Sequence, residues 1–241
     1  MRFLFLTILV WCAAAQGQDE ATASRVADTK FSVDRGFYQG PFYVQIHTAT
    51  ENARIVYTTN GMTPGSVFTS QSYPGGEGIL IETTTVLRVM ATTQGHVSTV
   101  VDTHTYIFPE HVVHQPEEPL GFSTAWQGAD YGMDQDPAHL SLIAGDPNLS
   151  PEAAKEVIAD ALLALPTLSL AHGDLFGKAK GIHRNTQDLG KAWERPVFAE
   201  WIYPDGRKGF QIDGGIPMQR FTSRDPARNP KHSLRLVFRD E

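Results

Sequence analysis

Short extended segments separated by turn signals occupy residues 31 to 108, and this pattern limits the folds open to that part of the chain. The segment PFYVQIHT alternates apolar and polar residues, as expected of a half-buried strand. The segments ARIVYTT, GILIETTTVLRVMATT and STVVDTHTYIF are rich in β-branched residues and show no sustained helical periodicity. The Asn60–Gly61 pair is a strong turn signal, because both residue types tolerate a positive φ. This regular spacing predicts a small antiparallel β-sandwich over residues 30–108.

The first seventeen residues have the layout of a secretory signal peptide. One arginine precedes an apolar run from Phe3 to Val10, and small residues follow it. The run is too short to cross a bilayer comfortably. We therefore expect a signal peptide at 1–17, a flexible polar leader at 18–29, and a protein that is secreted, periplasmic or attached to the cell surface. A lipid anchor on Cys12 is the alternative, but the bulky Trp11 before it argues against lipidation.

The composition excludes several classes of protein. The chain has 241 residues and a net charge of −7, which argues against non-specific binding to nucleic acid, since that requires a basic surface. Cys12 is the single cysteine, so removal of the signal peptide leaves neither a disulfide nor a thiolate metal site. We expect no transmembrane segment after signal removal, because no second apolar stretch is long enough.

The second half of the chain has a different pattern. Residues 109–127 contain three prolines and two adjacent glutamates, which predict a linker. Ser150 is a good helix N-cap, Pro151 suits the first helical position, and Pro166 ends the helix. Its predicted buried face consists of Ala154, Val157, Ile158, Ala161, Leu162 and Leu165. The segments TLSLAH, ERPVFAEWIY, GRKGFQIDGGIPMQ and HSLRLVF resemble strands, with a hairpin turn at 204–206. We therefore expect an α+β region over 128–241.

A search for catalytic motifs is mostly negative. The chain has no phosphate-binding loop, no nucleophile elbow, no HExxH motif and no dinucleotide fingerprint. The cluster Asp130, Asp134 and Asp136 could bind a cation, but a turn of solvated acids is the preferred interpretation. Nine histidines show no metal-ligand spacing, and His111 and His114 are expected to be solvated.

Basic residues gather near the end of the sequence. They are Arg220, Arg224, Arg228, Lys231, Arg235 and Arg239. On the last expected strand, Lys231 and Arg235 share one face and could bind phosphate oxygens. A solvated outer strand face explains the same residues more simply, and the residues alone favour that interpretation.

The first half resembles a known module. FSVDRGFYQGPFYVQI, ARIVYTTNGMTPG and TTTVLRVMATTQGHVSTVVDTHTYIF are similar to the Ig-like sandwich at the C-terminus of chitobiase and β-hexosaminidases. The core of this similarity runs from Tyr57 to Pro64. The resemblance implies an accessory module without hydrolase activity, and one functional alternative is binding of extracellular or cell-wall polysaccharide. Tyr38 and Tyr43 could stack on sugars, although sandwich core is the preferred interpretation of both.

Residues 120–241 resemble the opening part of a second family, the bacterial spore-coat protein H (CotH) kinase-like family. The motifs ADYGMD, ALPTLSL, DLFG, GIHRN, GxxWERP, PDGxxGFQ and SRDPARNPKHSLRLVFR match in order. This resemblance implies a kinase-like fold, ATP and Mg²⁺ as cofactors, and a secreted protein as phosphate acceptor. It makes Lys231, Arg235, Ser223 and Arg224 candidate nucleotide-binding residues.

Two departures from that family affect the expected activity. The segment from Gly215 to Phe221 has a proline and lacks two glycines that the family commonly carries, although close approach of backbone to phosphate needs glycine. The acidic residues that hold Mg²⁺ and orient the nucleophile lie later in family members. We therefore expect an incomplete kinase-like region at 128–241, with no catalytic or metal-binding residues, that is inactive as a phosphotransferase alone.

Overall fold

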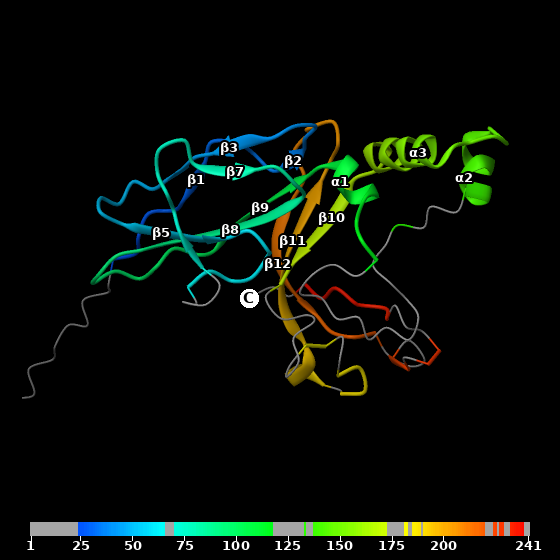
Figure 1. The fold of residues 1–241 in the computed structure, drawn as a ribbon. Helices are drawn as coiled ribbons and strands as arrows, with labels where there is room; N and C mark the ends of the chain where they lie inside the picture. The colour runs from blue at the N-terminus through cyan, green and yellow to red at the C-terminus, as the bar shows by residue number, and fades with distance from the viewer. Residues whose placement is uncertain are drawn as a thin grey trace, which may run out of the picture.

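The computed structural model describes residues 24–65, 70–117, 133, 137–172, 181–182, 185–188, 190–219, 224–225, 227–228 and 232–238. Within them a β-sandwich (β1 to β9) is followed by short helices and then by a three-stranded sheet, as Figure 1 shows. In these described segments, no helix has the length and apolar character needed to cross a membrane.

The sandwich has two layers. The larger sheet has the order β2 (Gly36–Phe37), β9 (Asp102–Ile107), β8 (Thr85–Thr92), β5 (Arg54–Thr58) and β6 (Gln71–Ser72). The facing layer pairs β1 (Lys30–Phe31) with β4 (Ile46–His47), and β3 (Phe42–Val44) with β7 (Ile79–Ile81). All these pairs are antiparallel except β2–β9. The predicted sandwich is confirmed in this region.

Strand alternation explains the sandwich core. Along β8, Leu87 and Val89 point inward and are fully buried, and Tyr106 on β9 does the same. They pack with Val44 and Ile46 from the facing layer in one apolar cluster. Because successive side chains of a strand point to opposite faces, the residues between them form the outer face of the larger sheet.

The turns depend on two glycines. Gly61 has a φ of +75°, and the Asn60 side-chain oxygen accepts a hydrogen bond from the Met62 N–H (3.2 Å), so the predicted turn is present. At Gly78, which has a φ of +104°, an added Cβ would lie 2.3 Å from the Val44 carbonyl oxygen. Only glycine fits this position without a shift of the backbone.

The prediction of a flexible leader was wrong for residues 24–29. The Val26 side chain is buried, and its N–H donates to the Val97 carbonyl (2.9 Å). The Thr29 hydroxyl donates to the Asp102 carboxylate. Backbone pairing with the loop before β9 orders this segment, despite its polar, alanine-rich composition.

Three short helices follow the sandwich. Helix α1 (Pro109–Val113) lies in the segment predicted as a linker. Its Val113 packs with Leu140 of α2 (Pro137–Ala144) and with α3 (Pro151–Ala164). The rest of the expected linker, residues 118–127, lies outside the described residues.

Helix α3 begins as predicted. The Ser150 hydroxyl accepts a hydrogen bond from the Ala153 N–H (3.2 Å), and Pro151 is the first helical residue. Its buried face is narrower than predicted, because Leu165 is 68% exposed and Ala161 is also exposed. Ala154, Ile158 and Ala159 of the helix are buried against α1 and α2, and Leu162 is partly buried against the same cluster.

The third group is an antiparallel sheet. It consists of β10 (Thr167–Ala171), β11 (Arg195–Ile202) and β12 (Gln211–Ile216), with a single 3₁₀ turn η1 (Lys191–Trp193) before β11. The predicted hairpin between β11 and β12 is confirmed, with Gly206 at a φ of +74°. The C-terminal segment 232–238 pairs with residues 215–219, since the Gly215 and Val237 N–H groups each donate to the other residue's carbonyl (2.8 Å).

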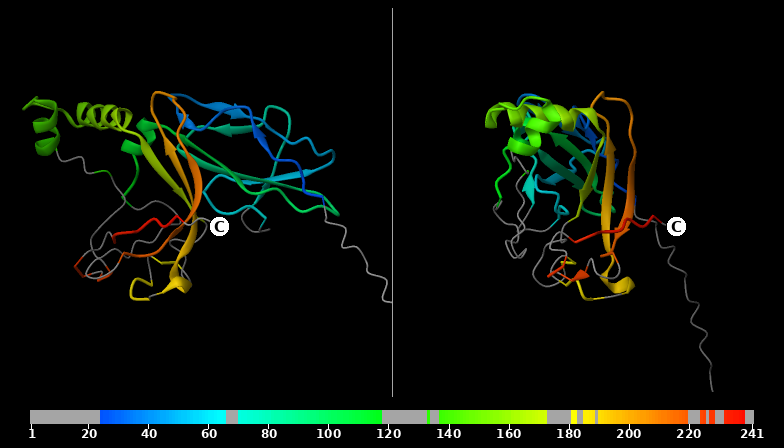
Figure 2. Two further views of the ribbon diagram at one scale, coloured as in Figure 1. Left: turned by 180° about the vertical axis from the view of Figure 1, so that it is seen from behind. Right: turned by 90° about the vertical axis from the view of Figure 1, so that its right-hand side faces the viewer.

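The sheet β10–β11–β12 lies beside the sandwich in both views of Figure 2, and hydrogen bonds join it to Thr103 and Thr105 of β9. The outer-face residues Arg88, Thr103 and Thr105 are buried there, although all three are polar. The second sheet thus covers the sandwich through a polar interface, and this arrangement positions the candidate site.

Candidate functional site

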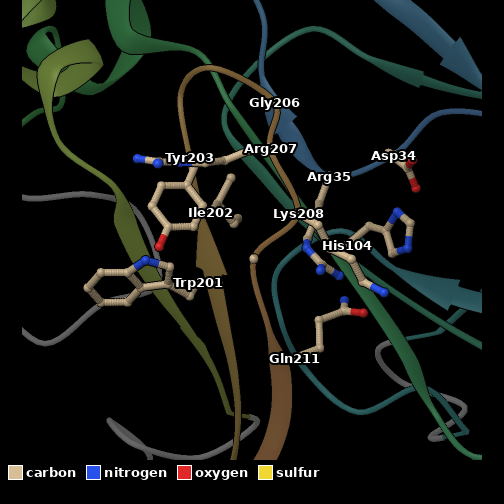
Figure 3. Close-up of a pocket in the computed structure, with 11 residues that line it drawn as sticks. Asp34, Arg35, His104, Trp201, Ile202, Tyr203, Gly206, Arg207, Lys208 and Gln211 are labelled. Atoms are coloured by element: carbon tan, nitrogen blue, oxygen red, sulfur yellow. The ribbon is translucent and has the colours of Figure 1, made fainter.

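A pocket of about 380 Å³ lies where the sandwich meets the loop of the β11–β12 hairpin. Asp34, Arg35 and His104 line it from the sandwich, and residues 201–203, 206–209 and 211 line it from the hairpin. Figure 3 shows Arg35, His104, Lys208 and Gln211 on one side of the hairpin, with the Trp201 and Tyr203 rings on the other. The hairpin therefore has a polar side and an aromatic side.

Arg35 is the most enclosed cation of the pocket. Its side chain is 18% exposed, and its Nε lies 3.9 Å from Glu200 Oε1. Among the described residues the guanidinium makes no hydrogen bond. A guanidinium carries five N–H donors in a rigid fork, so Arg35 retains most of its donor capacity for an acceptor in the pocket.

His104 lies on β9 beside Arg35. Its ring stacks on Phe31, with ring centroids 4.0 Å apart and an interplanar angle of 8°. Its Nδ1 is buried and has no hydrogen-bond partner within the described part of the chain. Burial, and next the Arg35 charge, lower the pKa of His104 from 6.5 to about 4, so the imidazole is neutral at pH 7.

Glu200 forms the floor beneath Arg35. It is fully buried on β11, where its carboxylate accepts hydrogen bonds from the Thr105 hydroxyl and from Gln211 Nε2 (3.0 Å). Gln211 also donates to the Thr103 carbonyl (2.8 Å), and Thr105 and Ser169 share a hydrogen bond of 2.7 Å. Burial raises the pKa of Glu200, against the effect of its hydrogen bonds and of Arg35. This network joins the two units under the pocket.

The aromatic side of the hairpin faces away from the sandwich. Trp201 and Phe210 are cross-strand neighbours whose rings are nearly parallel, with centroids 6.0 Å apart and an interplanar angle of 12°. Tyr203 meets Trp201 edge-on, and the Arg207 guanidinium lies 3.9 Å from the centre of the tyrosine ring. Phe210 is 46% exposed. We call Trp201, Tyr203 and Phe210 the aromatic surface.

Two of the predicted nucleotide-binding residues are described. The Arg224 guanidinium donates to four main-chain carbonyls, those of Gln219 (2.9 Å), Thr186 (3.0 Å), Asp188 (2.6 Å) and Met218 (2.9 Å). Arg224 thus links two stretches of backbone, 186–188 and 218–219, which leaves it little capacity for phosphate. Arg235 is exposed, and its N–H donates to the Pro217 carbonyl (3.1 Å). Lys231 and Ser223 lie outside the described residues.

The two candidate sugar-stacking tyrosines lie in different environments. Tyr38 packs against Phe42, Tyr106 and Phe108, as core was preferred for it, whereas Tyr43 is 46% exposed. The cluster Asp130, Asp134 and Asp136 lies outside the described residues. Within the described residues, no group of three His, Cys, Asp or Glu side chains is placed to hold a metal ion.

Sequence reasoning missed Arg35, His104 and Glu200. One signal was available for the last two, because each occupies an apolar position of an alternating strand. His104 shares its strand face with Tyr106, and Glu200 shares its face with Phe198 and Ile202. A polar residue in such a position is expected to have a buried partner. No comparable signal marks Arg35, which lies in a turn.

Comparison with known proteins supports the first of the two resemblances. No curated protein and no solved structure matches the chain. None of the comparisons gives evidence for the kinase-like family. Residues 33–103 match the family described as the chitobiase/beta-hexosaminidase C-terminal domain, a carbohydrate-associated module that coincides with the sandwich.

Proposed function

We propose that this chain is an extracellular accessory protein that binds polysaccharide through the aromatic surface of the β11–β12 hairpin. The observation that carries the proposal is the nearly parallel pair of Trp201 and Phe210 rings on the face turned away from the sandwich. The match of residues 33–103 to a carbohydrate-associated module supports the same class of ligand.

The geometry of the aromatic surface suits a sugar chain. The flat C–H face of a pyranose ring is apolar and stacks on an aromatic ring, whereas its hydroxyls need polar partners at the edge. Trp201 and Phe210 provide rigid rings on the two arms of the β11–β12 hairpin, so binding orders few side-chain torsions. Arg207 lies over Tyr203 and can donate to hydroxyls at the edge of the surface.

Retention on insoluble polysaccharide tests the proposal. The full chain without its signal peptide is incubated with chitin, peptidoglycan and cellulose, and bound and free protein are measured. We expect retention on at least one of them, and a loss of about tenfold in affinity for Trp201→Ala, the scale of one well-packed aromatic contact. Phe238→Ala is the control, because Phe238 is an exposed aromatic residue outside the aromatic surface. Failure of all three polymers to retain the protein, or equal binding by Trp201→Ala, would refute the proposal.

The kinase-like resemblance provides a second candidate function. Pairing of residues 232–238 with 215–219 extends the sheet β10–β11–β12, which suits the strand order expected of a nucleotide-binding lobe. In this proposal Lys231 and Arg235 contact the phosphates of ATP, and the 241-residue chain does not transfer phosphate by itself. Incubation with labelled ATP and Mg²⁺ tests it. Labelling that Lys231→Ala abolishes would overturn the proposed inactivity.

The proposal includes export of the protein, which rests on the expected signal peptide at residues 1–17. N-terminal sequencing of the mature protein checks this, since cleavage after Ala15 or Gly17 is expected. A mature protein that begins at Met1 would contradict it.

A further inference from the structure

We infer that the sandwich carries a second polysaccharide-binding surface, on the outer face of its facing layer and centred on Tyr43. Along β3 and β4, Tyr43, Gln45 and His47 point away from the core and are exposed, whereas Val44 and Ile46 between them are buried. We call Tyr43, Gln45 and His47 the outer row. The inference takes the class of ligand from the proposed function, but none of its residues belongs to the hairpin.

Tyr43 forms an exposed apolar pair with Leu80. The two residues are directly opposite in the antiparallel pairing of β3 with β7, and they are 46% and 42% exposed. The Cβ atoms of such cross-strand partners lie about 5 Å apart, so the tyrosine ring and the leucine side chain form one patch. This patch offers the flat face of a pyranose ring an apolar platform, as the aromatic surface does on the hairpin.

The rest of the outer row provides hydrogen-bonding groups beside this platform. Residues two apart on a strand lie about 7 Å apart on the same face, so Gln45 and His47 continue in a line from Tyr43. Amide and imidazole groups can both donate to and accept from sugar hydroxyls. The Gln45 amide makes one long hydrogen bond, to the Gly76 carbonyl (3.4 Å), whereas the Gln45 main chain is fixed by two shorter bonds with Ser32 (2.8 and 2.9 Å). The backbone thus holds the row in place while its side chains stay available to a ligand.

The charges around the outer row favour uncharged sugar rings over a charged polymer. Lys30 lies opposite His47 in the pairing of β1 with β4, and the exposed Glu82 directly follows β7. One cation and one anion leave this surface without a net charge, whereas nucleic acid requires a basic surface. The whole outer row also lies within residues 33–103, which match the carbohydrate-associated module. In Figure 1, β3 and β7 form the side of the sandwich opposite β5 and β8.

Two surfaces on one chain hold a polymer more tightly than either surface alone. Once one surface is bound, the other meets the same polymer at a high effective concentration, and the apparent affinity can rise by about a hundredfold or more. Loss of either surface should therefore weaken retention on polysaccharide, and loss of both should abolish it.

Retention of the full mature chain on chitin, cellulose and peptidoglycan tests the inference. Tyr43→Thr removes the ring but keeps a residue that favours strands, and it should lower the affinity about tenfold. Leu80→Thr should also weaken binding, because it removes the other half of the platform. Leu165→Thr is the matched control, since it makes the same change at an exposed leucine at the end of α3 and should have no effect.

The Tm of each variant is measured beside its binding, and Gln45→Ala, which changes only an exposed polar side chain, replaces any variant that does not fold. Unaltered retention in Tyr43→Thr and Leu80→Thr, or an equal loss in Leu165→Thr, overturns the inference. Trp201→Ala in the same series separates the two surfaces. Full retention by Trp201→Ala with weakened retention by Tyr43→Thr overturns the hairpin surface alone, and the reverse result overturns the outer row alone. Failure of every polymer to retain the wild type overturns both.

Discussion

Protonation of His104 is expected to destabilise the fold between pH 6.5 and pH 4. The pKa of this buried imidazole falls from 6.5 to about 4 on folding, so the unfolded chain binds the proton more tightly than the folded chain. The stabilisation is complete above pH 6.5, decreases as the pH falls, and is lost below pH 4. One pKa unit corresponds to about 1.4 kcal/mol, so the whole shift is worth about 3 kcal/mol, with about 2 kcal/mol already lost at pH 5.

Urea denaturation of the wild type and of His104→Phe, at intervals from pH 7 to pH 4, measures this effect. The phenyl ring preserves the stack on Phe31 and cannot be protonated. The pKa values of Glu200 and Asp102 are raised by burial and change stability in the opposite direction, but they do so in both proteins and cancel in the difference. The wild type should therefore lose about 3 kcal/mol more than the variant. Parallel losses in the two proteins would refute the burial argument.

Four further perturbations test the fold. Burial raises the pKa of Glu200, so its contribution to stability is complete below pH 4.5 and is lost as the pH rises, and Glu200→Gln should remove this dependence of stability on pH. Glu200→Ala should cost about 3 kcal/mol in urea denaturation, because the hydrogen-bond partners of Glu200 stay buried. Arg224→Lys cannot bond four carbonyls, and hydrogen exchange at 186–188 and 218–219 should accelerate about tenfold or more. Gly78→Ala should lower Tm far more than Gly75→Ala, since only Gly78 has backbone in the way of a Cβ. A fragment that ends at residue 110 should be a soluble monomer by gel filtration, because the sandwich face it uncovers is polar; aggregation would contradict this.

Local patterns were sufficient to predict the sandwich and helix α3. Strand alternation over 42–46 and 85–91 specifies which side chains fill the core, and it does so without knowledge of the partner strand. The cap at Ser150 and the hairpin turn before Gly206 are determined within a few residues for the same reason. The leader at 24–29 could not be predicted this way. Its order depends on pairing with Val97, and nothing in its own composition indicates that partner.

The candidate site depends on contacts that no local pattern contains. Thr105 and Glu200 are 95 residues apart, and their hydrogen bond requires the second sheet to cover the outer face of β9. That covering buries Thr103, Thr105 and Glu200 between the two sheets, whereas His104 lies on the inner face of β9, stacked on Phe31. A polar residue on the outer face of a sheet is therefore either exposed to solvent or covered by a second layer. In this chain Glu200 indicates a second layer, because it is a charged residue at an apolar position of β11 and such a residue needs a buried partner.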